Sequence, residues 1–264
     1  MVPLIIAIFS VIIFLVVRII TSEPNTAQDY LEDVKIGGST KRWQGAFELS
    51  KILSNPKMIP KDDRFILEMI SSFEYASNDR DSRVRQYLAL AMGATKDSRY
   101  VPTLLASLDS SEPEMIMASI HALGNIGDNA AVQSIINILD HGEAKVRLQA
   151  VISLGKIGDK SSISNLKEMM TDSEVNVRWD AAIALAKLGD PSGQRILLDL
   201  LDRSYLDSFP NIDEIEQVQA MMVAIQVAPF IQDLELKTSL VHLKQNDPNL
   251  KIREAARKTL TQFE

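Results

Sequence analysis

The side chains that carry out most enzymatic chemistry are few and scattered in this sequence of 264 residues. The three histidines, His121, His141 and His242, lie far apart and show no metal-ligand spacing. Cysteine is absent, which excludes disulfides, thiolate catalysis and cysteine-based zinc sites. No phosphate-binding loop pattern occurs, and no pair of carboxylates indicates a shared pocket. We therefore expect a protein that is not an enzyme and that binds no metal or cofactor.

The overall charge also argues against nucleic acid as a ligand. The chain carries 35 acidic and 28 basic residues, a net charge of −7. Binding to a phosphate backbone needs a clustered basic face, which this balance does not favour. Hydrophobic residues make up 46% of the chain and charged residues 24%, a composition typical of a folded protein.

The strongest feature of the sequence is a repeat of 31 residues between Asp81 and Asp202. The last residue of each unit is an aspartate, at Asp97, Asp128, Asp159 and Asp190. An acidic residue opens each unit, and an apolar row recurs with the same spacing: Asp81, Glu112, Glu143 and Glu174; Met92, Leu123, Leu154 and Leu185. A fixed period between 20 and 50 residues indicates a stacked solenoid.

Each unit is predicted to contain two helices, which in the unit after Asp128 are residues 131–139 and 145–156. Small residues recur in the second helix, where neighbouring helices must approach closely: Ala91, Ala122, Ser153 and Ala184, each followed by Gly93, Gly124, Gly155 and Ala186. Three glycines follow the predicted helix ends, where a left-handed C-cap is expected: Gly127, Gly158 and Gly189.

The first segment of the chain, residues 2–17, is apolar except for Ser10, and two isoleucines extend it past Arg18. A helix of 19 residues spans roughly 28 Å, close to the hydrocarbon thickness of a bilayer. A cleaved signal peptide is the alternative, but it requires a basic start and a small-x-small cleavage site, and neither is present. We therefore expect an uncleaved single-pass anchor over residues 1–20. Its membrane-facing residues would include Leu4, Ile8, Phe9, Ile12, Phe14, Leu15 and Arg18.

The orientation of this anchor follows from the basic residues around it. None precedes the apolar segment, whereas Arg18, Lys35, Lys41 and Arg42 follow it. The positive-inside rule then places the remainder of the chain in the cytoplasm, next to a bacterial inner membrane or an equivalent one.

The remainder divides into a tether and a repeat region. Residues 21–40 are polar, carry Pro24 and end in Gly37-Gly38-Ser39-Thr40, which predicts a short tether. The repeat extends in less regular form over residues 41–264. An insertion of about nine residues, relative to the 31-residue frame, interrupts it at 203–213.

The best-preserved unit reads Glu143-Ala-Lys-Val-Arg-Leu-Gln-Ala-Val-Ile-Ser-Leu-Gly-Lys-Ile-Gly-Asp159. It resembles the short HEAT-like repeats first associated with phycobilisome linker-lyase subunits, whose pattern is acidic-x-x-Val-Arg-x-x-Ala-x-x-Ala-Leu-Gly-x-Ile-Gly-Asp. The unit at 112–128 departs from this pattern at Ile116 and Ser119. The resemblance covers residues 41–262. It implies an all-α, right-handed α-solenoid of about seven HEAT-like helical hairpins, here preceded by a single transmembrane helix.

The resemblance also assigns a structural role to two rows of charged residues. It implies a ladder in which arginines brace the turns of adjacent units through carboxylates and carbonyls. One row is Arg85, Arg147, Arg178 and Arg253, and the other is Asp109, Asp140 and Asp202. A basic groove for anionic ligands is the alternative, but Ile116 interrupts it. We favour the ladder, because charged repeat positions usually serve the stacking.

In this family the second helix of each unit lines the concave face, so its variable positions are the informative ones. Free positions on a soluble solenoid should be polar, yet five of them are apolar: Met117, Leu148, Trp179, Ile152 and Ile183. If they are exposed, they form a contiguous patch that would bind a protein. If they pack between neighbouring helices, they belong to the core. The sequence leaves both interpretations open.

The insertion offers a second candidate surface. It carries Tyr205, Phe209 and Pro210 among several aspartates. Insertions in solenoids form loops on one face, often the binding face. A plain surface loop is the alternative.

These observations predict a membrane-anchored protein-binding scaffold, or an accessory subunit of a membrane protein complex, that binds its protein partners without covalent chemistry. The resemblance allows one alternative, a chromophore (bilin) lyase-like protein or chaperone. A second alternative is a purely structural subunit held in its complex by the transmembrane helix alone. No nucleic acid is expected among the partners.

Overall fold

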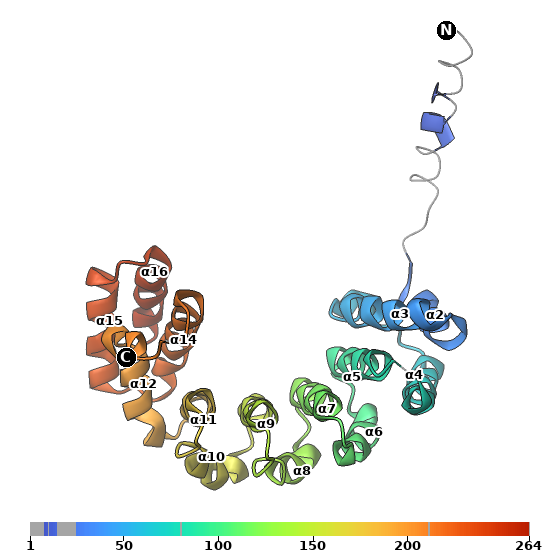
Figure 1. Cartoon of the computed structure of the whole chain (residues 1–264). Coiled ribbons are helices and arrows are strands. Elements are labelled where there is room, and N and C mark those ends of the chain that lie inside the picture. Colours follow the sequence, from blue (N-terminus) through green and yellow to red (C-terminus); the bar gives the residue numbers. More distant parts are fainter. Residues whose placement is uncertain (1–7, 10, 15–24, 80, 211, 264) are drawn as a thin grey trace.

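The computed structural model describes residues 8–9, 11–14, 25–79, 81–210 and 212–263. Every regular element in these ranges is a helix, and the helices stack into a solenoid with the outline of a U (Figure 1). The predicted all-α solenoid is confirmed.

Within the described residues the helices form seven consecutive pairs, as the repeat predicts. The first helices of the pairs are α2 (Ala27–Ile36), α4 (Asp63–Tyr75), α6 (Val101–Ala106), α8 (Val132–Ile136), α10 (Ile163–Met169), α12 (Gln194–Leu200) and α15 (Leu234–Asn246). The second helices are α3 (Ser39–Ile52), α5 (Arg83–Thr95), α7 (Pro113–Ile126), α9 (Ala144–Ile157), α11 (Val175–Lys187), α14 (Glu214–Val227) and α16 (Leu250–Thr259). The short helix α13 (Arg203–Asp207) lies inside the sixth pair.

Short 3-10 helices complete the turns and the helix ends. Four of them lead into first helices of the pairs: η3 (Ser98–Tyr100), η5 (Asn129–Ala131), η6 (Lys160–Ser162) and η7 (Pro191–Gly193). The others are η1 (Pro56–Met58), η2 (Ala76–Asn78), η4 (Ser107–Asp109), η8 (Ala228–Phe230) and η9 (Leu260–Gln262). Figure 1 shows the second helices α5, α7, α9 and α11 on the inner side of the U and α6, α8 and α10 on the outer side.

The end of each unit is fixed by a glycine and an aspartate. Gly127, Gly158 and Gly189 adopt φ angles of 77°, 81° and 74°, the left-handed conformation that was predicted. The aspartate that follows each of them accepts a hydrogen bond from the backbone N–H two residues later, as Asp128 does from Ala130 at 2.9 Å. This bond starts the next 3-10 helix, so one sequence motif ends a unit and begins its successor.

The inner helices touch through their small residues. A side-chain carbon added at Gly93 of α5 would lie 2.5 Å from the Cα of Ala122 on α7. One added at Gly124 would lie 2.6 Å from the Oγ of Ser153 on α9. The backbones of adjacent inner helices therefore approach as closely as glycine allows, and this contact recurs from α5 to α11.

The predicted tether is wrong over half of its length. Residues 27–36 of the segment 21–40 form α2, which packs against α3 and α4. Ala27, Leu31 and Val34 are buried because they recur with helical spacing on one face. Thr26 and Asp29 form a capping box that starts the helix. The helix was not predicted because the segment is polar overall and only these three apolar residues mark its buried face.

The predicted membrane anchor lies largely outside the described residues, which include none of Leu4, Leu15 and Arg18. Among the residues that are described, no helix is long and apolar enough to cross a membrane. The described side chains of the segment, from Ile8 to Phe14, are exposed.

We predict that Gly93→Ala lowers the free energy of unfolding by about 1–3 kcal/mol, because the new methyl group would press on the backbone of Ala122. Gly142→Ala is the control, since no atom lies within 4 Å of a side-chain carbon added there. Urea unfolding of both variants measures the difference. Equal stabilities would show that the inner helices can separate without cost.

Candidate binding face

Three of the four predicted arginines, Arg147, Arg178 and Arg253, brace the turns by donating to backbone carbonyls. Arg85 does not: its guanidinium lies over the ring of Phe73, and its buried Nε has no hydrogen-bond partner among the described residues. Arg147 donates to both carboxylate oxygens of Asp172 at 2.7 and 2.8 Å and to the carbonyl of His141 at 2.9 Å. Arg178 donates to the carbonyls of Asp172 and Ser173. The carboxylate partner, however, is not in the predicted aspartate row. Within the described part of the chain, Asp109 and Asp140 form no ion pair, and Asp202 instead caps α13.

The ladder is not continuous. Ile116 is buried at the arginine position of the third pair, so this position supplies no brace to the turn. Ser119, which replaces an alanine of the pattern, is also buried, and its hydroxyl lies 2.6 Å from that of Ser107. The two residues of this unit that depart from the repeat pattern, Ile116 and Ser119, therefore both pack in the core. They do not indicate an anion-binding groove.

The insertion supplies an arginine where the repeat has lost one. On α14 the bracing position is Gln217, whose amide donates to the carbonyl of Leu206 at 3.3 Å. It forms no bond to the buried carboxylate of Asp247. Arg203 at the start of α13 donates to this carboxylate instead, at 2.7 and 2.9 Å. The inserted helix is thus tied to the last pair by an ion pair with one partner almost fully buried.

The insertion also covers one end of the apolar concave row. Phe209 packs edge-on against Trp179 with ring centroids 5.4 Å apart, and Tyr205 packs against Phe209 at 5.1 Å. The indole N–H of Trp179 donates to the hydroxyl of Tyr205 at 3.2 Å. Tyr205 and Phe209 are therefore partly buried on the concave side and do not form a free surface loop.

The predicted patch divides into a buried end and a partly exposed strip. Trp179 and Ile183 are each only 5% exposed, so for them the core interpretation is correct. Met117, Leu148 and Ile152 are half-buried and stay accessible on the inner side of the solenoid. These three side chains form what we call the concave strip. The strip runs from α7 to α9 and ends next to the three aromatic rings of Trp179, Tyr205 and Phe209.

A hollow of about 240 Å³ lies at the end of the concave strip, between α9, α11 and α14. We call it the α11–α14 hollow. Its apolar walls include Leu148, Trp179, Ile183 and Val223, and its polar lining comprises Asn176, Asp180, Glu216 and Gln219. The space exists because the insertion displaces α14 from the position that the regular repeat would give it. Consistent with this, α11 packs less extensively against α14 than against α9.

Asp180 is the most unusual group in this hollow. Burial raises the pKa of its carboxyl to about 6, and the positive charge of Lys187 offsets this only in part. Among the described residues, no donor forms a hydrogen bond or an ion pair with this carboxylate. Sequence reasoning missed Asp180 because its position in the repeat gives no sign that the side chain is shielded from water.

Two lysines follow the concave positions on the inner helices. Lys156 and Lys187 occupy equivalent positions near the ends of α9 and α11. Burial and the charge of Lys187 lower the pKa of Lys156, and burial followed by the charge of Lys156 lowers the pKa of His121. Lys187 follows Asp180 by seven residues on α11, and its positive charge acts on the carboxylate of Asp180 as well as on Lys156.

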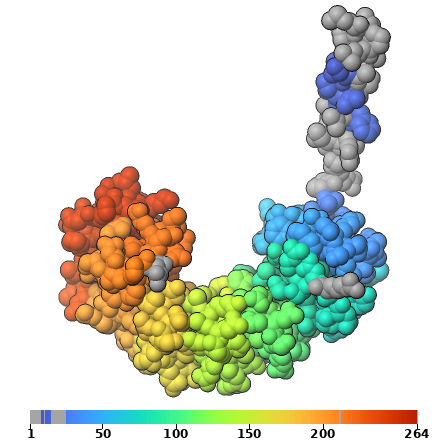
Figure 2. All heavy atoms as spheres, viewed as in Figure 1, coloured from blue at the N-terminus to red at the C-terminus, as the bar shows by residue number. Residues whose placement is uncertain are grey.

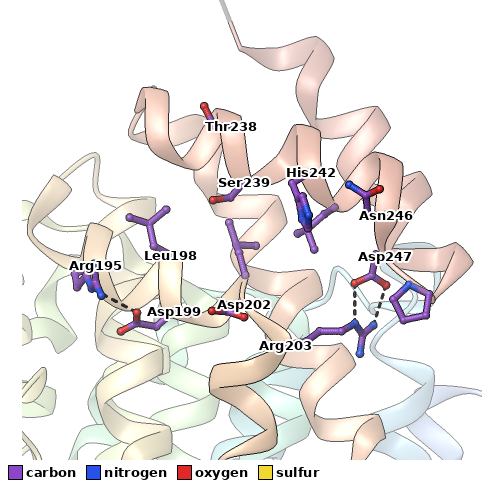
Figure 3. A pocket seen from close by; sticks show the side chains of 13 residues that line it. Arg195, Leu198, Asp199, Asp202, Arg203, Thr238, Ser239, His242, Asn246 and Asp247 are labelled. Atoms are coloured by element: carbon purple, nitrogen blue, oxygen red, sulfur yellow. Dashed lines mark hydrogen bonds and ion pairs between the residues drawn. The ribbon is translucent and has the colours of Figure 1, made fainter.

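A larger cleft of about 580 Å³ separates α12 from α15 (Figure 3). Ser239 and His242 project into it from α15, and the Arg203–Asp247 pair closes one end. In the described part of the chain, no hydrogen bond joins His242 to Ser239 or to a carboxylate, so the cleft contains no assembled nucleophile and base. No group of three or more metal-ligating residues occurs in the same ranges.

The sequence matches the family described as HEAT repeats over residues 72–144 and 132–207, which together span just over half of the chain. A chain in the structure of the CpcE–CpcF complex of phycocyanin lyase from Nostoc sp. PCC7120 superposes with a TM-score of 0.62 at 17% identity, covering 91% of this chain and 97% of that one. YibA from E. coli superposes with a TM-score of 0.52 at 19% identity, covering 89% and 81%. No curated protein sequence matches the chain. Identities this low show a shared fold alone.

We predict that Asp180→Asn stabilises the protein in a pH-dependent way. The folded pKa of about 6 lies above the ordinary value of 3.8, so the native state disfavours the charged form. Ionisation of Asp180 thus costs stability as the pH rises toward 6. The variant should gain about 3 kcal/mol at pH 8, roughly half of that at pH 5, and about 0.5 kcal/mol near pH 4. Urea unfolding at these pH values measures the gain, and a gain independent of pH would contradict this explanation.

Proposed function

Because the chain belongs to the HEAT-repeat family, we propose that it is a membrane-anchored scaffold that holds a protein partner, without covalent chemistry, on its concave face. The concave strip carries this proposal. Met117, Leu148 and Ile152 each leave part of an apolar side chain accessible on inner helices α7 and α9, while Met117 and Leu148 also pack against the core. A protein partner that covers the strip would remove this apolar surface from water.

The dimensions of the concave side also favour a protein over a small molecule. Figure 2 shows a broad hollow between the two arms of the U, open along its length. The α11–α14 hollow of about 240 Å³ is one feature within this surface. A ligand that contacts both the strip and this hollow must extend over α7, α9, α11 and α14, which a peptide segment or a protein surface can do.

The membrane anchor is part of the same proposal. The described apolar side chains near the N-terminus have no protein cover, since Ile8, Phe9, Ile12 and Phe14 are 54%, 64%, 49% and 65% exposed. Lipid would cover them. With basic residues following the segment, the solenoid would lie on the cytoplasmic side of a bacterial inner membrane or its equivalent. The role would be that of an accessory subunit of a membrane protein complex, and not that of an enzyme.

The likeness to the phycocyanin lyase complex supports the fold and does not extend to bilin chemistry here. The comparison gives no residue correspondence at 17% identity. The concave strip favours protein binding over chromophore attachment, because the side chains gathered there are apolar and lack a nucleophile.

We expect a Leu148→Asp, Ile152→Asp double variant to lose the partners that copurify with the full-length protein in mild detergent. Both side chains are half-buried, so charge on them should disrupt docking while circular dichroism shows the helices intact. The control is Leu234→Asp, since Leu234 is 74% exposed at the start of α15. If the double variant retains every partner, the concave strip is not the contact, and the N-terminal segment becomes the leading alternative.

A further inference from the structure

The α11–α14 hollow contains a carboxylate with no hydrogen bond or ion pair from the described residues, and the charge of Lys187 offsets its burial only in part. Asp180 is flanked on α11 by Trp179 and Ala181, both buried, and no described residue bonds to its side chain. Removing a carboxylate from water without a compensating partner is unfavourable. A partner group that brings positive charge to this carboxylate would relieve the cost, and only a group entering through the open side of the hollow can do so.

A second carboxylate faces the same space from the other wall. Glu216 lies on the first turn of α14 and lines the hollow together with Asp180 of α11. Glu216 is exposed, whereas Asp180 is half-buried. A cation placed between them would interact with one shielded and one hydrated carboxylate, an arrangement that attracts positive charge and rejects negative charge.

The walls of the hollow suit a long apolar stem beneath that charge. Leu148, Ile183 and Val223 line the hollow, with the indole of Trp179 beside them. Lysine and arginine combine an aliphatic stem with a terminal cation, and arginine also stacks on aromatic rings.

We propose that the α11–α14 hollow receives a lysine or arginine side chain from the protein partner, with Asp180 and Glu216 as its acceptors. This inference rests on the proposed function and names the chemistry of the partner segment. The segment presents one basic side chain next to apolar ones, which cover the concave strip.

The probe for a direct test is n-butylguanidinium, with n-butylurea as its neutral analogue. Trp179 lines the hollow, so its fluorescence reports binding once Trp43, the other tryptophan, is replaced by phenylalanine. We expect a saturable change with n-butylguanidinium and at least about fivefold weaker binding of n-butylurea, since a partly shielded ion pair contributes on the order of 1 kcal/mol.

Three variants in the Trp43→Phe background make the test specific. Asp180→Asn should abolish the preference for the cation, and Glu216→Gln should reduce it, while Glu254→Gln on α16 should leave it unchanged. Glu216 and Glu254 are both exposed, so their variants keep the test valid even if the Asp180 variant folds poorly. Equal affinity for the charged and neutral compounds, or a preference that survives both Asp180→Asn and Glu216→Gln, would overturn the proposal.

The proposed function can fail separately from this inference. If partners depend on Leu148 and Ile152 but neither a preference for n-butylguanidinium nor an effect of Asp180→Asn is found, the concave face binds protein and the hollow does not select a basic side chain. If n-butylguanidinium binds as expected but no partner depends on the concave strip, the hollow is selective and the scaffold role is wrong.

Discussion

The close contact between successive inner helices is the constraint on which the structure depends. Gly93 against Ala122, Gly124 against Ser153 and Gly155 against Ala184 leave no space for a larger side chain at these crossings. Small residues bring the backbones of α5, α7, α9 and α11 together, so the side chains between the contacts must point either to the outer helices or to the inner surface. The concave strip is a consequence of this contact, because Met117, Leu148 and Ile152 occupy positions that the close packing turns inward.

The insertion ends this regular packing. At Ala186 the glycine of the repeat is lost, and α13 enters between α12 and α14. The hydrophobic core accordingly falls into two clusters that meet at α11, which contributes side chains to both. Arg203 and the Trp179–Tyr205–Phe209 contacts hold the displaced pairs in place. The space left between α11 and α14 is the hollow that contains Asp180, so the same interruption creates the site and stabilises its surroundings.

The 31-residue period in the sequence predicted the structural features that recur in every unit. The turn glycines, the capping aspartates and the small contact residues were all visible in the 31-residue spacing, because each unit repeats the same packing problem. The helix over residues 27–36, the substitution of Arg203 for a lost brace and the burial of Asp180 were not visible. Each depends on a contact between segments outside the regular frame, and a repeat pattern contains no information about such contacts. The same limit left the concave row ambiguous, since the burial of Trp179 depends on its contacts with Tyr205 and Phe209 of the insertion.

Site-specific photo-crosslinking in the cell tests most directly whether the concave face holds the partner. A benzophenone side chain at position 152 would sit on the concave strip, and one at position 133 would sit on the exposed face of outer helix α8. The account predicts a discrete crosslinked protein from position 152 and none from position 133. Crosslinks of equal yield from both positions, or from position 133 alone, would contradict it.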